Sequence, residues 1–369
     1  MARKLQSDKW IFLATLALVC TSVVMVYSAS ALVALERFQQ PYLFVTKQVM
    51  WVAFGVALMS IVMRVDYRNY RDERLMWALL AVVGLLLVAV LFSPKVNGTR
   101  RWFGIAGFGI QPSELAKIAV IFFSALILER RVHRINEVAY SLAPIALIVS
   151  AIVGLILLEP DFGTAVSLLA VVTVMVYVAG LSYKYFIGSV LLMIPVLVVV
   201  MLQAPYRVRR ILAFLNPWAD PLGDGFQIIQ SLIAVGTGGV FGLGLMEGKQ
   251  KLFFLPEPHT DFIYAVIAEE TGMLGALVVL ACFGVIAWRG MRTAFRAPDS
   301  FGAYLAIGLT MMLVLQAFVN ISVVLGLAPT KGIPLPLVSA GGSSLLINLV
   351  GIGVLLNISQ HSVSETGAA

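Results

Sequence analysis

The feature that most constrains this chain is a series of apolar blocks, each about 20 residues long and separated by short polar stretches. A helix of that length crosses the ~30 Å hydrocarbon core of a bilayer and satisfies its own backbone hydrogen bonds there. Charged residues make up 12% of the sequence, against roughly 25% in an ordinary soluble domain. The sequence therefore predicts an all-α integral membrane protein with about ten transmembrane helices. The helices are expected near residues 10–33, 47–63, 75–92, 113–128, 141–158, 163–180, 185–203, 261–287, 302–326 and 335–357.

Arginine clusters in alternate turns predict which side of the membrane each turn faces. Cytoplasmic turns are enriched in lysine and arginine, and an even number of spans puts both termini on the same side. We therefore expect both termini in the cytoplasm and a single polytopic membrane domain over residues 1–369. Within it we expect a cytoplasmic stub at 1–9, a large extracytoplasmic loop at 203–260 between the seventh and eighth helices, and a cytoplasmic tail at 359–369. The clustered arginines are Arg64, Arg68, Arg71, Arg74, Arg130, Arg131, Arg134, Arg289, Arg292 and Arg296.

Basic residues also occur in segments on the predicted outer side, where the charge rule disfavours them. One interpretation is that long loops cross the membrane regardless of their charge. The other is that these cations hold an anion just outside the membrane, near the ends of helices. A lipid-linked phosphate or pyrophosphate fits that position better than a soluble metabolite does. The cations are Lys95, Arg100, Arg101, Arg207, Arg209, Arg210, Lys249, Lys251 and Lys331.

The motif QPSELAK opens the fourth predicted helix, with Pro112 near the first helical position, where its missing N–H does no harm. Glu114 and Lys117 follow three residues apart and are neighbours on the helix surface. One interpretation is a structural ion pair that ties the helix entrance to its neighbours. The other is that Lys117 contacts phosphate while Glu114 maintains the charge and orientation of that lysine. The two roles are compatible with each other.

A glycine-rich run covers residues 236–251 and matches a dinucleotide-binding loop only superficially, because no predicted strand precedes it. Glycines here could let a helix or re-entrant turn pack closely against other helices. They could also let backbone N–H groups approach phosphate, with Lys249 and Lys251 at the end of the run. We favour close packing over phosphate binding.

The stretch LPEPHTDFIYAVIAEETG brings Glu257, His259 and Asp261 to the start of the eighth predicted helix. Asp261 stands where an N-cap belongs, so one interpretation is that it only satisfies the free N–H groups of the helix. The other is a mixed acid-base site at the membrane surface, in which a carboxylate deprotonates a hydroxyl. Glu269 and Glu270, deeper in the helix, are expected to make separate structural contacts.

Seven motifs are spread over nearly the whole chain. They are VYSAS (26–30), NGTRRW (97–102), QPSELAK (111–117), EPDFGTA (159–165), NPWADPLGDGFQIIQS (216–231), LPEPHTDFIYAVIAEE (255–270) and PTKGIPLPLVSAGGSS (329–344). Through these motifs the chain resembles the SEDS family (shape, elongation, division and sporulation) of bacterial cell-wall polymerases, and within it the FtsW branch. The lysine of PTKG, Lys331, and the VYSAS ending of the first helix favour FtsW over the RodA branch. The sporulation member SpoVE would match similarly.

The resemblance implies a peptidoglycan glycosyltransferase in the bacterial cytoplasmic (inner) membrane, acting in cell division or septal wall synthesis. It would polymerise lipid II into glycan strands on the outer face and release undecaprenyl pyrophosphate. Asp261 would be the general base for the acceptor's sugar hydroxyl; a helix N-terminus would lower its basicity, whereas Glu257 or desolvation would raise it. Outer cations would neutralise the pyrophosphate. The residues expected to bind substrate are Arg101, Glu114, Lys117, Arg210, Lys249, Lys251, Glu257, His259, Lys331 and Ser339.

The resemblance also implies partners. The main one is a class B penicillin-binding protein, which is a transpeptidase, and other division proteins and membrane lipid join it; no nucleic acid is expected. A divalent cation, Mg²⁺ or Mn²⁺, is compatible with carboxylates and pyrophosphate, since both are hard oxygen ligands. The sequence defines no ligand set for such a cation.

Two other functions fit a chain of apolar helices. A lipid II flippase would use the intramembrane charges Glu114, Lys117, Glu159 and Asp161 to carry its cargo across the bilayer. Such a transporter needs charge along the whole path, whereas the motif charges gather on the predicted outer side. A non-catalytic divisome scaffold would explain the helices but not the outer acids and bases. The sequence therefore favours the enzyme.

Overall fold

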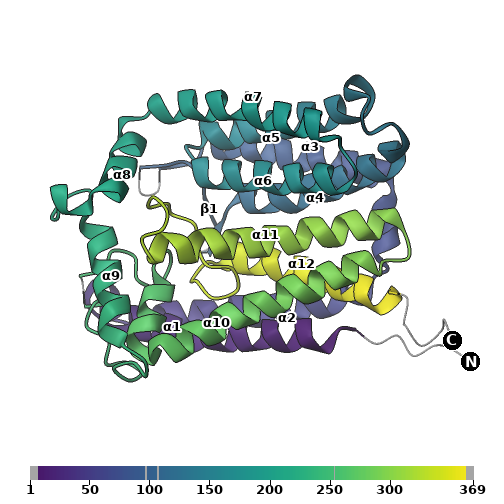
Figure 1. Ribbon diagram of the computed structural model, residues 1–369. Helices are drawn as coiled ribbons and strands as arrows, with labels where there is room; N and C mark the ends of the chain where they lie inside the picture. Colours follow the sequence, from purple (N-terminus) through teal and green to yellow (C-terminus); the bar gives the residue numbers. More distant parts are fainter. Residues whose placement is uncertain (1–6, 96–97, 106–107, 253, 363–369) are drawn as a thin grey trace, which may run out of the picture.

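The structure is a computed structural model that describes residues 7–95, 98–105, 108–252 and 254–362. Within these ranges the chain forms twelve α-helices and one antiparallel hairpin (Figure 1). The helices are α1 (Lys9–Phe38), α2 (Leu43–Val62), α3 (Glu73–Val90), α4 (Pro112–Arg131), α5 (Ala143–Leu158), α6 (Phe162–Val178), α7 (Tyr183–Leu202), α8 (Pro205–Leu215), α9 (Phe226–Gly238), α10 (Ile263–Phe295), α11 (Ser300–Val324) and α12 (Gly342–His361). The strands are β1 (Phe103–Ile105) and β2 (Phe108–Ile110), with Gly104 opposite Gly109.

Eight helices in the described ranges are long and apolar enough to cross a membrane. They are α1, α2, α3, α7, α10, α11, α12 and α5, the last counted together with the π-helical turn before it as Ala139–Leu158. The two other predicted spans coincide with α4, which carries several charged residues, and with α6, which has 17 residues. The all-α membrane class is confirmed, and each predicted span overlaps a helix. The total of about ten spans stays a prediction.

The segment 203–260, predicted as a loop, contains the helices α8 and α9. They have 11 and 13 residues, which is shorter than the about 20 that a transmembrane helix needs. Each is too short to be detected as an apolar block of about 20 residues, and proline and glycine residues flank both, so the segment was interpreted as a loop. α9 packs against α10 and α11, which places this segment against one end of the helical bundle.

The last helix begins later than predicted, at Gly342 instead of near residue 335. Pro334 and Pro336 precede it, and proline cannot donate a backbone hydrogen bond inside a helix. The residues between α11 and α12 therefore form a loop. This loop lies beside the candidate site described below.

The two described ends of the chain lie together. The backbone N–H of Asp8 donates to the Ser359 hydroxyl at 3.0 Å, so the start of α1 meets the end of α12. The predicted tail 359–369 therefore starts inside α12, and its residues 363–369 lie outside the described residues, as does most of the predicted stub, 1–6. Figure 1 shows α8 and α9 at the opposite end of the bundle.

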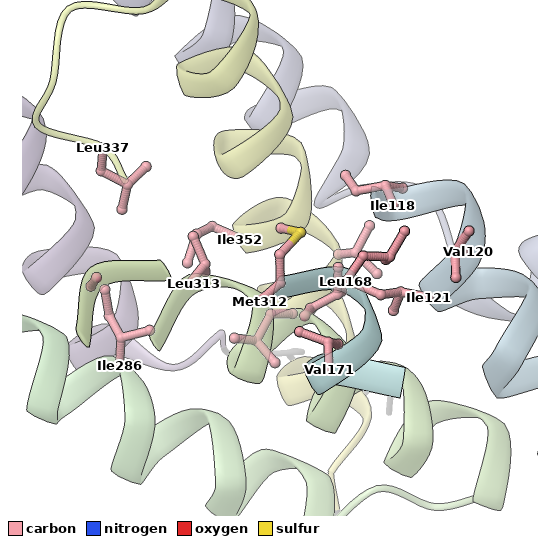
Figure 2. Close-up of a cluster of buried hydrophobic side chains, with 14 of the residues drawn as sticks. Ile118, Val120, Ile121, Leu168, Val171, Ile286, Met312, Leu313, Leu337 and Ile352 are labelled. Carbon is pink, nitrogen blue, oxygen red and sulfur yellow. The ribbon is translucent and has the colours of Figure 1, made fainter. Parts of the chain in front are cut away.

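The core is centred on α11, which packs against α4, α6, α9, α10 and α12. Figure 2 shows apolar side chains from α4, α6, α10, α11 and α12 meeting in one cluster. In a bilayer, such van der Waals packing holds helices together, because lipid tails are as apolar as the side chains. α7 has no buried residue over its described length and contacts α8. The clustered residues include Ile118, Ile121, Leu168, Val171, Ile286, Met312, Leu313 and Ile352.

The glycine-rich run after α9 packs directly against α10. α10 contains a non-helical residue, Gly272, with φ 69° and ψ −167°. A Cβ on Gly242 would lie 2.1 Å from the carbonyl oxygen of Glu270, and one on Gly238 would lie 2.0 Å from that of Ala268. These separations leave no space for a side chain. The close-packing interpretation of the run is therefore confirmed.

Candidate active site

Asp261 lies in a turn just before α10 and is partly exposed. The capping interpretation is wrong, because α10 begins at Ile263 and its capping position is Phe262, with no side-chain cap. Asn320 of α11 holds the turn by donating hydrogen bonds to the carbonyl oxygens of Asp261, at 2.8 Å, and Ile333, at 2.7 Å. The backbone of Asp261 is thus fixed while its carboxylate remains available.

The loop between α11 and α12 runs beside this carboxylate. A Cβ on Gly332 would lie 3.0 Å from Oδ2 of Asp261. Arg210 of α8 donates a long hydrogen bond, 3.5 Å, to the carbonyl of Thr330 in the same loop, one residue before Lys331. The loop therefore brings two of the predicted cations, Arg210 and Lys331, into the neighbourhood of Asp261.

The charge state of Asp261 is set by its surroundings. Burial, with a further contribution from the negative charge of Glu257, raises the pKa of its carboxyl to about 7. Arg210 and Arg101 lower this pKa, and Asp161 raises it, by smaller amounts. Within the described residues no hydrogen-bond donor contacts the carboxylate. A carboxyl with a pKa near neutrality is suited to general-base catalysis at physiological pH.

Lys331 is partly buried against an aromatic ring. Its Nζ lies 5.2 Å from the centre of the Phe162 ring at the start of α6, a cation–π contact. Burial lowers the pKa of the Lys331 ammonium. In the part of the chain that the structure describes, no acid forms an ion pair with it. An anion bound beside the Lys331 ammonium would stabilise its charged form and so oppose the effect of burial.

Arg101 is held by the EPDFGTA motif. Its guanidinium donates to the backbone carbonyl of Glu159, at 2.9 Å, and to that of Pro160. It also lies 3.9 Å from the Asp161 carboxylate, which caps α6 and accepts a hydrogen bond from Gln111 at 3.1 Å. From the sequence, Asp161 was assigned only to the alternative transporter function, and Gln111 had no assigned role. The available signal was the position of Asp161 just before an apolar helix, which is typical of an N-cap.

Glu159, at the end of α5, is fully buried, and neither carboxylate oxygen has a hydrogen-bond partner among the described residues. Burial and the neighbouring charge of Asp161 raise the pKa of Glu159 to about 8, against the opposing effect of Arg101. The side chain is therefore mostly neutral at pH 7. As a neutral group it does not compete with Asp161 for the Arg101 charge.

Glu257 and His259 belong to the turn segment that leads to Asp261. Glu257 is exposed, whereas His259 is buried against Phe44, with ring centres 4.9 Å apart. The His259 Nε2 is 3.9 Å from the Glu257 carboxylate. Burial lowers the pKa of His259, so the imidazole is neutral at pH 7. Glu257 thus acts on Asp261 through its charge, and His259 acts as a packed support.

Ser339 joins the two loops of the site. Its hydroxyl donates to the carbonyl of Thr260 at 2.5 Å and accepts from the N–H of Leu335 at 2.8 Å. The N–H of Ala340 also donates to the carbonyl of His259 at 2.9 Å. The Ser339 hydroxyl is therefore already engaged in holding the loop before α12 against the turn before α10.

Glu114 and Lys117 form a buried ion pair beneath the site. The Lys117 ammonium lies 2.8 Å from the Glu114 carboxylate, and each side chain is 4% exposed. Lys117 also donates to Gln316 of α11 at 2.9 Å, and Gln316 donates to the carbonyl of Pro334 at 3.0 Å. The predicted pairing is confirmed. Lys117 reaches the loop beside Asp261 through Gln316 and borders a cavity of only about 10 Å³, enough for one water.

Lys251 lies in a buried polar cluster that includes a residue of α1. Its Nζ lies 2.6 Å from the Glu270 carboxylate and 2.8 Å from the Ser28 hydroxyl. The Lys249 side chain is exposed, and its backbone N–H donates to Glu269 at 2.8 Å. Glu269 and Glu270 therefore hold different parts of the glycine-rich segment, which confirms their predicted structural contacts.

The structure thus divides the predicted site residues into two sets. The inner set consists of charged residues around Asp261, and the supporting set consists of residues whose polar groups contact other parts of the protein. Around Asp261 it gathers charges from five chain segments. The supporting residues are engaged with other protein groups, as described above. Within the described ranges no three His, Cys, Asp or Glu side chains converge as a metal site. The charged residues gathered around Asp261 are Arg101, Asp161, Arg210, Glu257 and Lys331.

The family model described as "Cell cycle protein", which covers FtsW, RodA and SpoVE, matches residues 9–364 of the chain. This chain belongs to that family. The match includes the turn with Asp261, the loop with Lys331 and both partners of the Glu114–Lys117 pair.

Curated members of the FtsW/RodA/SpoVE family are similar over almost their whole length. The probable peptidoglycan glycosyltransferase FtsW of Geobacter metallireducens is 44% identical over 96% of this chain and 95% of its own. Stage V sporulation protein E of Bacillus subtilis is 42% identical over 98% of this chain and 99% of its own. The predicted resemblance to the FtsW and SpoVE members is therefore confirmed.

Solved structures of family members share the fold. One is a chain in a structure that describes the coordination of polymerization and crosslinking by a peptidoglycan synthase complex. It matches with a TM-score of 0.79 and 32% identity, over 96% of this chain and 97% of the other. The rod shape determining protein RodA of Thermus thermophilus matches with a TM-score of 0.71 and 27% identity, over 98% and 99% of the two chains.

Proposed function

We propose that this chain is a peptidoglycan glycosyltransferase that polymerises lipid II into glycan strands. The observation that carries the proposal is the Asp261 carboxylate, which has a pKa of about 7 and lies beside the loop of Lys331 and Arg210. Transfer of a sugar from a pyrophosphate-linked donor needs a base for the acceptor and positive charge for the leaving group. The names of the similar proteins support the same activity.

In the proposed reaction, Asp261 accepts the proton of the acceptor's sugar hydroxyl. The hydroxyl oxygen forms a bond to the anomeric carbon of the donor sugar as the bond from that carbon to the pyrophosphate oxygen breaks. Undecaprenyl pyrophosphate leaves with the bonding electron pair. The raised pKa of Asp261 makes the carboxylate a stronger base than an exposed aspartate.

Arg210 and Lys331 are the best placed cations to neutralise the pyrophosphate. Both belong to the neighbourhood of Asp261, and Lys331 has no ion-pair partner among the described residues. Arg101 already holds two backbone carbonyls and the Asp161 carboxylate, so its contribution is mainly to fix the outer end of α6. Positive charge near a leaving group is most effective where water is excluded.

Glu114 and Lys117 act as positioning residues in this scheme. The pair, through Gln316, supports the loop that places Lys331 beside Asp261. Lys251 and Lys249 belong to the segment that packs on α10, away from the inner set. Their role is to hold the glycine-rich run in place.

A divalent cation at this site would take most of its ligands from the substrate. The acids around the site are Asp161, Glu257 and Asp261, and Mg²⁺ is commonly bound by one or two carboxylates together with substrate phosphates and water. Such a cation would add positive charge at the leaving pyrophosphate. Asp261 would still accept the proton.

We place the site on the outer face of the bacterial cytoplasmic membrane, with both termini in the cytoplasm. The arginine-rich turns lie at the end of the bundle where α1 begins and α12 ends, and the positive-inside rule assigns that end to the cytoplasm. The similarity to FtsW supports a role in division, with a class B penicillin-binding protein as the transpeptidase partner.

The test is polymerisation of lipid II by the purified chain in detergent, with and without the partner transpeptidase. A detergent micelle does not separate two compartments, so transport of lipid II by a flippase could not be measured in it. We expect glycan strands on a gel with the chain present. Transport of lipid II across liposomes without strand formation would favour a flippase. Partner binding without either reaction would favour a scaffold.

A further inference from the structure

The short helix α8 carries three arginines that differ in their surroundings. It follows α7 directly, at the end of the bundle away from the chain termini (Figure 1). Arg207 and Arg210 are three residues apart and lie on one face of the helix. Both are half-buried, whereas Arg209 is exposed and pairs with Asp224 at 3.3 Å. The spacing therefore separates two arginines that face the protein from one that faces outward.

The ring of Phe162, the first residue of α6, connects Arg207 with Lys331. The guanidinium carbon of Arg207 and the Nζ of Lys331 each lie 5.2 Å from the centre of this ring. The Tyr206 ring is a second such contact, because Arg207 lies 5.4 Å and Arg210 lies 6.0 Å from its centre. Cation–π contacts hold the charged groups in place, but a neutral ring does not cancel their charge.

In the described part of the chain, no acid forms a salt bridge with Arg207, Arg210 or Lys331. Among those residues Arg207 donates only to neutral oxygens, the Tyr206 hydroxyl at 3.0 Å and the Val200 carbonyl at 2.8 Å. Arg210 likewise donates there only to a backbone carbonyl. A guanidinium has five N–H donors, so each arginine keeps donors for a further acceptor. Like charges gathered in a partly buried place are costly unless an anion joins them.

Two acids of the site leave this charge unbalanced. Asp161 directly precedes Phe162, but it caps α6 and lies 3.9 Å from Arg101. Asp261 is affected by the charge of Arg210 without forming an ion pair with it. The three cations therefore suit an anion with several oxygens that comes from outside the chain, and arginine matches the geometry of phosphate especially well.

We propose that Arg207 is a further substrate-binding residue, which contacts the lipid-linked phosphate of the donor while Lys331 and Arg210 contact the sugar-linked phosphate. This inference rests on the proposed sugar transfer and states which part of the diphosphate each cation binds. The Phe162 ring holds Arg207 and Lys331 at their places on either phosphate.

The order of the two phosphates follows from what lies at each end of the cluster. Lys331 adjoins Gly332, where a Cβ would lie 3.0 Å from the Asp261 carboxylate, so the donor sugar reacts at this end. Arg207 donates to the carbonyl of Val200 in the last turn of α7. α7 is long and apolar enough to cross a membrane, so the lipid chain of the donor belongs at that end.

The test is binding of undecaprenyl pyrophosphate and undecaprenyl monophosphate to the purified full chain, measured by native mass spectrometry. The monophosphate keeps only the lipid-linked phosphate. Arg207→Gln should therefore weaken the binding of both ligands about tenfold. Lys331→Gln should weaken the pyrophosphate about tenfold and the monophosphate much less. Arg207→Lys keeps the charge without the planar fork and should lose a smaller part, which keeps the test usable if Arg207→Gln does not fold.

The matched control is Arg209→Gln, which removes the same charge from the exposed face of the same helix. It should leave both affinities unchanged. Equal losses in the Arg207 and Arg209 variants would reduce the effect to general surface charge and overturn the proposal. Equal losses of the monophosphate in the Arg207 and Lys331 variants would overturn the order of the phosphates. Displacement of the pyrophosphate by an equal concentration of phosphatidylglycerol would show a general site for anionic lipid and would also overturn the proposal.

Binding and polymerisation can fail separately. If the unchanged chain binds the pyrophosphate through Arg207 but forms no glycan strands from lipid II, the proposed activity fails and the diphosphate site stands. If the unchanged chain forms strands, and Arg207→Gln binds both ligands and polymerises as well as it does, the assignment of Arg207 fails and the activity stands.

Discussion

At the scale of single residues, the chemistry depends on the protonation state of Asp261, which its neighbours control. The carboxyl must be deprotonated to act as a base, so the polymerisation rate should rise with pH through an ascending limb near pH 7. Glu257 raises the pKa of Asp261 through its negative charge. Glu257→Gln removes that charge and should move the ascending limb to lower pH. The measurement is the initial rate of lipid II polymerisation as a function of pH.

Arg210 provides the opposite test. Its positive charge lowers the pKa of Asp261, so Arg210→Gln should move the same limb to higher pH and also slow the reaction at its optimum. Glu247→Gln is the matched control, because Glu247 is exposed and has no part in the pKa shift of Asp261. Shifts in the same direction for the Glu257 and Arg210 variants would contradict the electrostatic account.

The sequence predicted the inner set of the site better than its supports. Asp261, Arg210 and Lys331 stand out because charged residues beside apolar helices are costly and therefore informative. The contacts of Lys117 with Gln316 and of Lys251 with Ser28 join residues about 200 positions apart, at separations of 199 and 223. No local pattern indicates such tertiary contacts. Nor does any indicate that Asn320 fixes the backbone of Asp261.

At the scale of elements, the fit of α9 against α10 depends on a missing side chain. A Cβ on Gly238 would lie 2.0 Å from a backbone oxygen of α10, whereas one on Gly236, in the same helix, would meet nothing within 4 Å. Gly238→Ala should therefore destabilise the protein by roughly 1–3 kcal/mol. Gly236→Ala should be neutral or slightly stabilising, because alanine favours helix. Thermal unfolding in detergent measures both, and equal effects would contradict the close packing.

The link between α4 and α11 can be tested by exchanging charges. Either Glu114→Lys or Lys117→Glu alone leaves like charges buried together, which should cost on the order of 3–5 kcal/mol. The combined exchange should recover part of the stability but not the activity, because the residue at 117 must donate to Gln316. A double-mutant cycle on thermal stability and on glycan synthesis separates the two effects. Recovery of both would show that the pair is purely structural.

Long helices were predictable and short or bent ones were not. Apolar blocks of about 20 residues predicted where each long helix lies, although some ends differ: α10 extends to Phe295 instead of 287, and α12 begins at Gly342 instead of 335. α8 and α9, with 11 and 13 residues, are too short to appear as apolar blocks of that length. Helix boundaries are the least certain part of such a prediction. Because α10 begins at Ile263, two residues later than expected, Asp261 does not occupy its N-cap position.

At the scale of the whole molecule, the account requires the end with α8 and α9 to face outward. In a background without Cys20 and Cys282, a cysteine at Leu222, which is 88% exposed, should react in intact cells whose outer barrier has been opened. The reagent is a membrane-impermeant thiol label. A cysteine at Asn69, exposed at the arginine-rich end, is the control and should react only after the inner membrane is broken. The reverse pattern would overturn the topology.

The central claim concerns chemistry at Asp261, and one substitution tests it most directly. Asp261→Asn keeps the size of the side chain and removes the base. In the assay with purified protein and lipid II, we expect this variant to fold as the unchanged chain does, with a similar unfolding temperature, and to form glycan strands at least about 100-fold more slowly. Strand formation at a rate near that of the unchanged chain, by a correctly folded Asp261→Asn protein, would contradict the proposed function of this site.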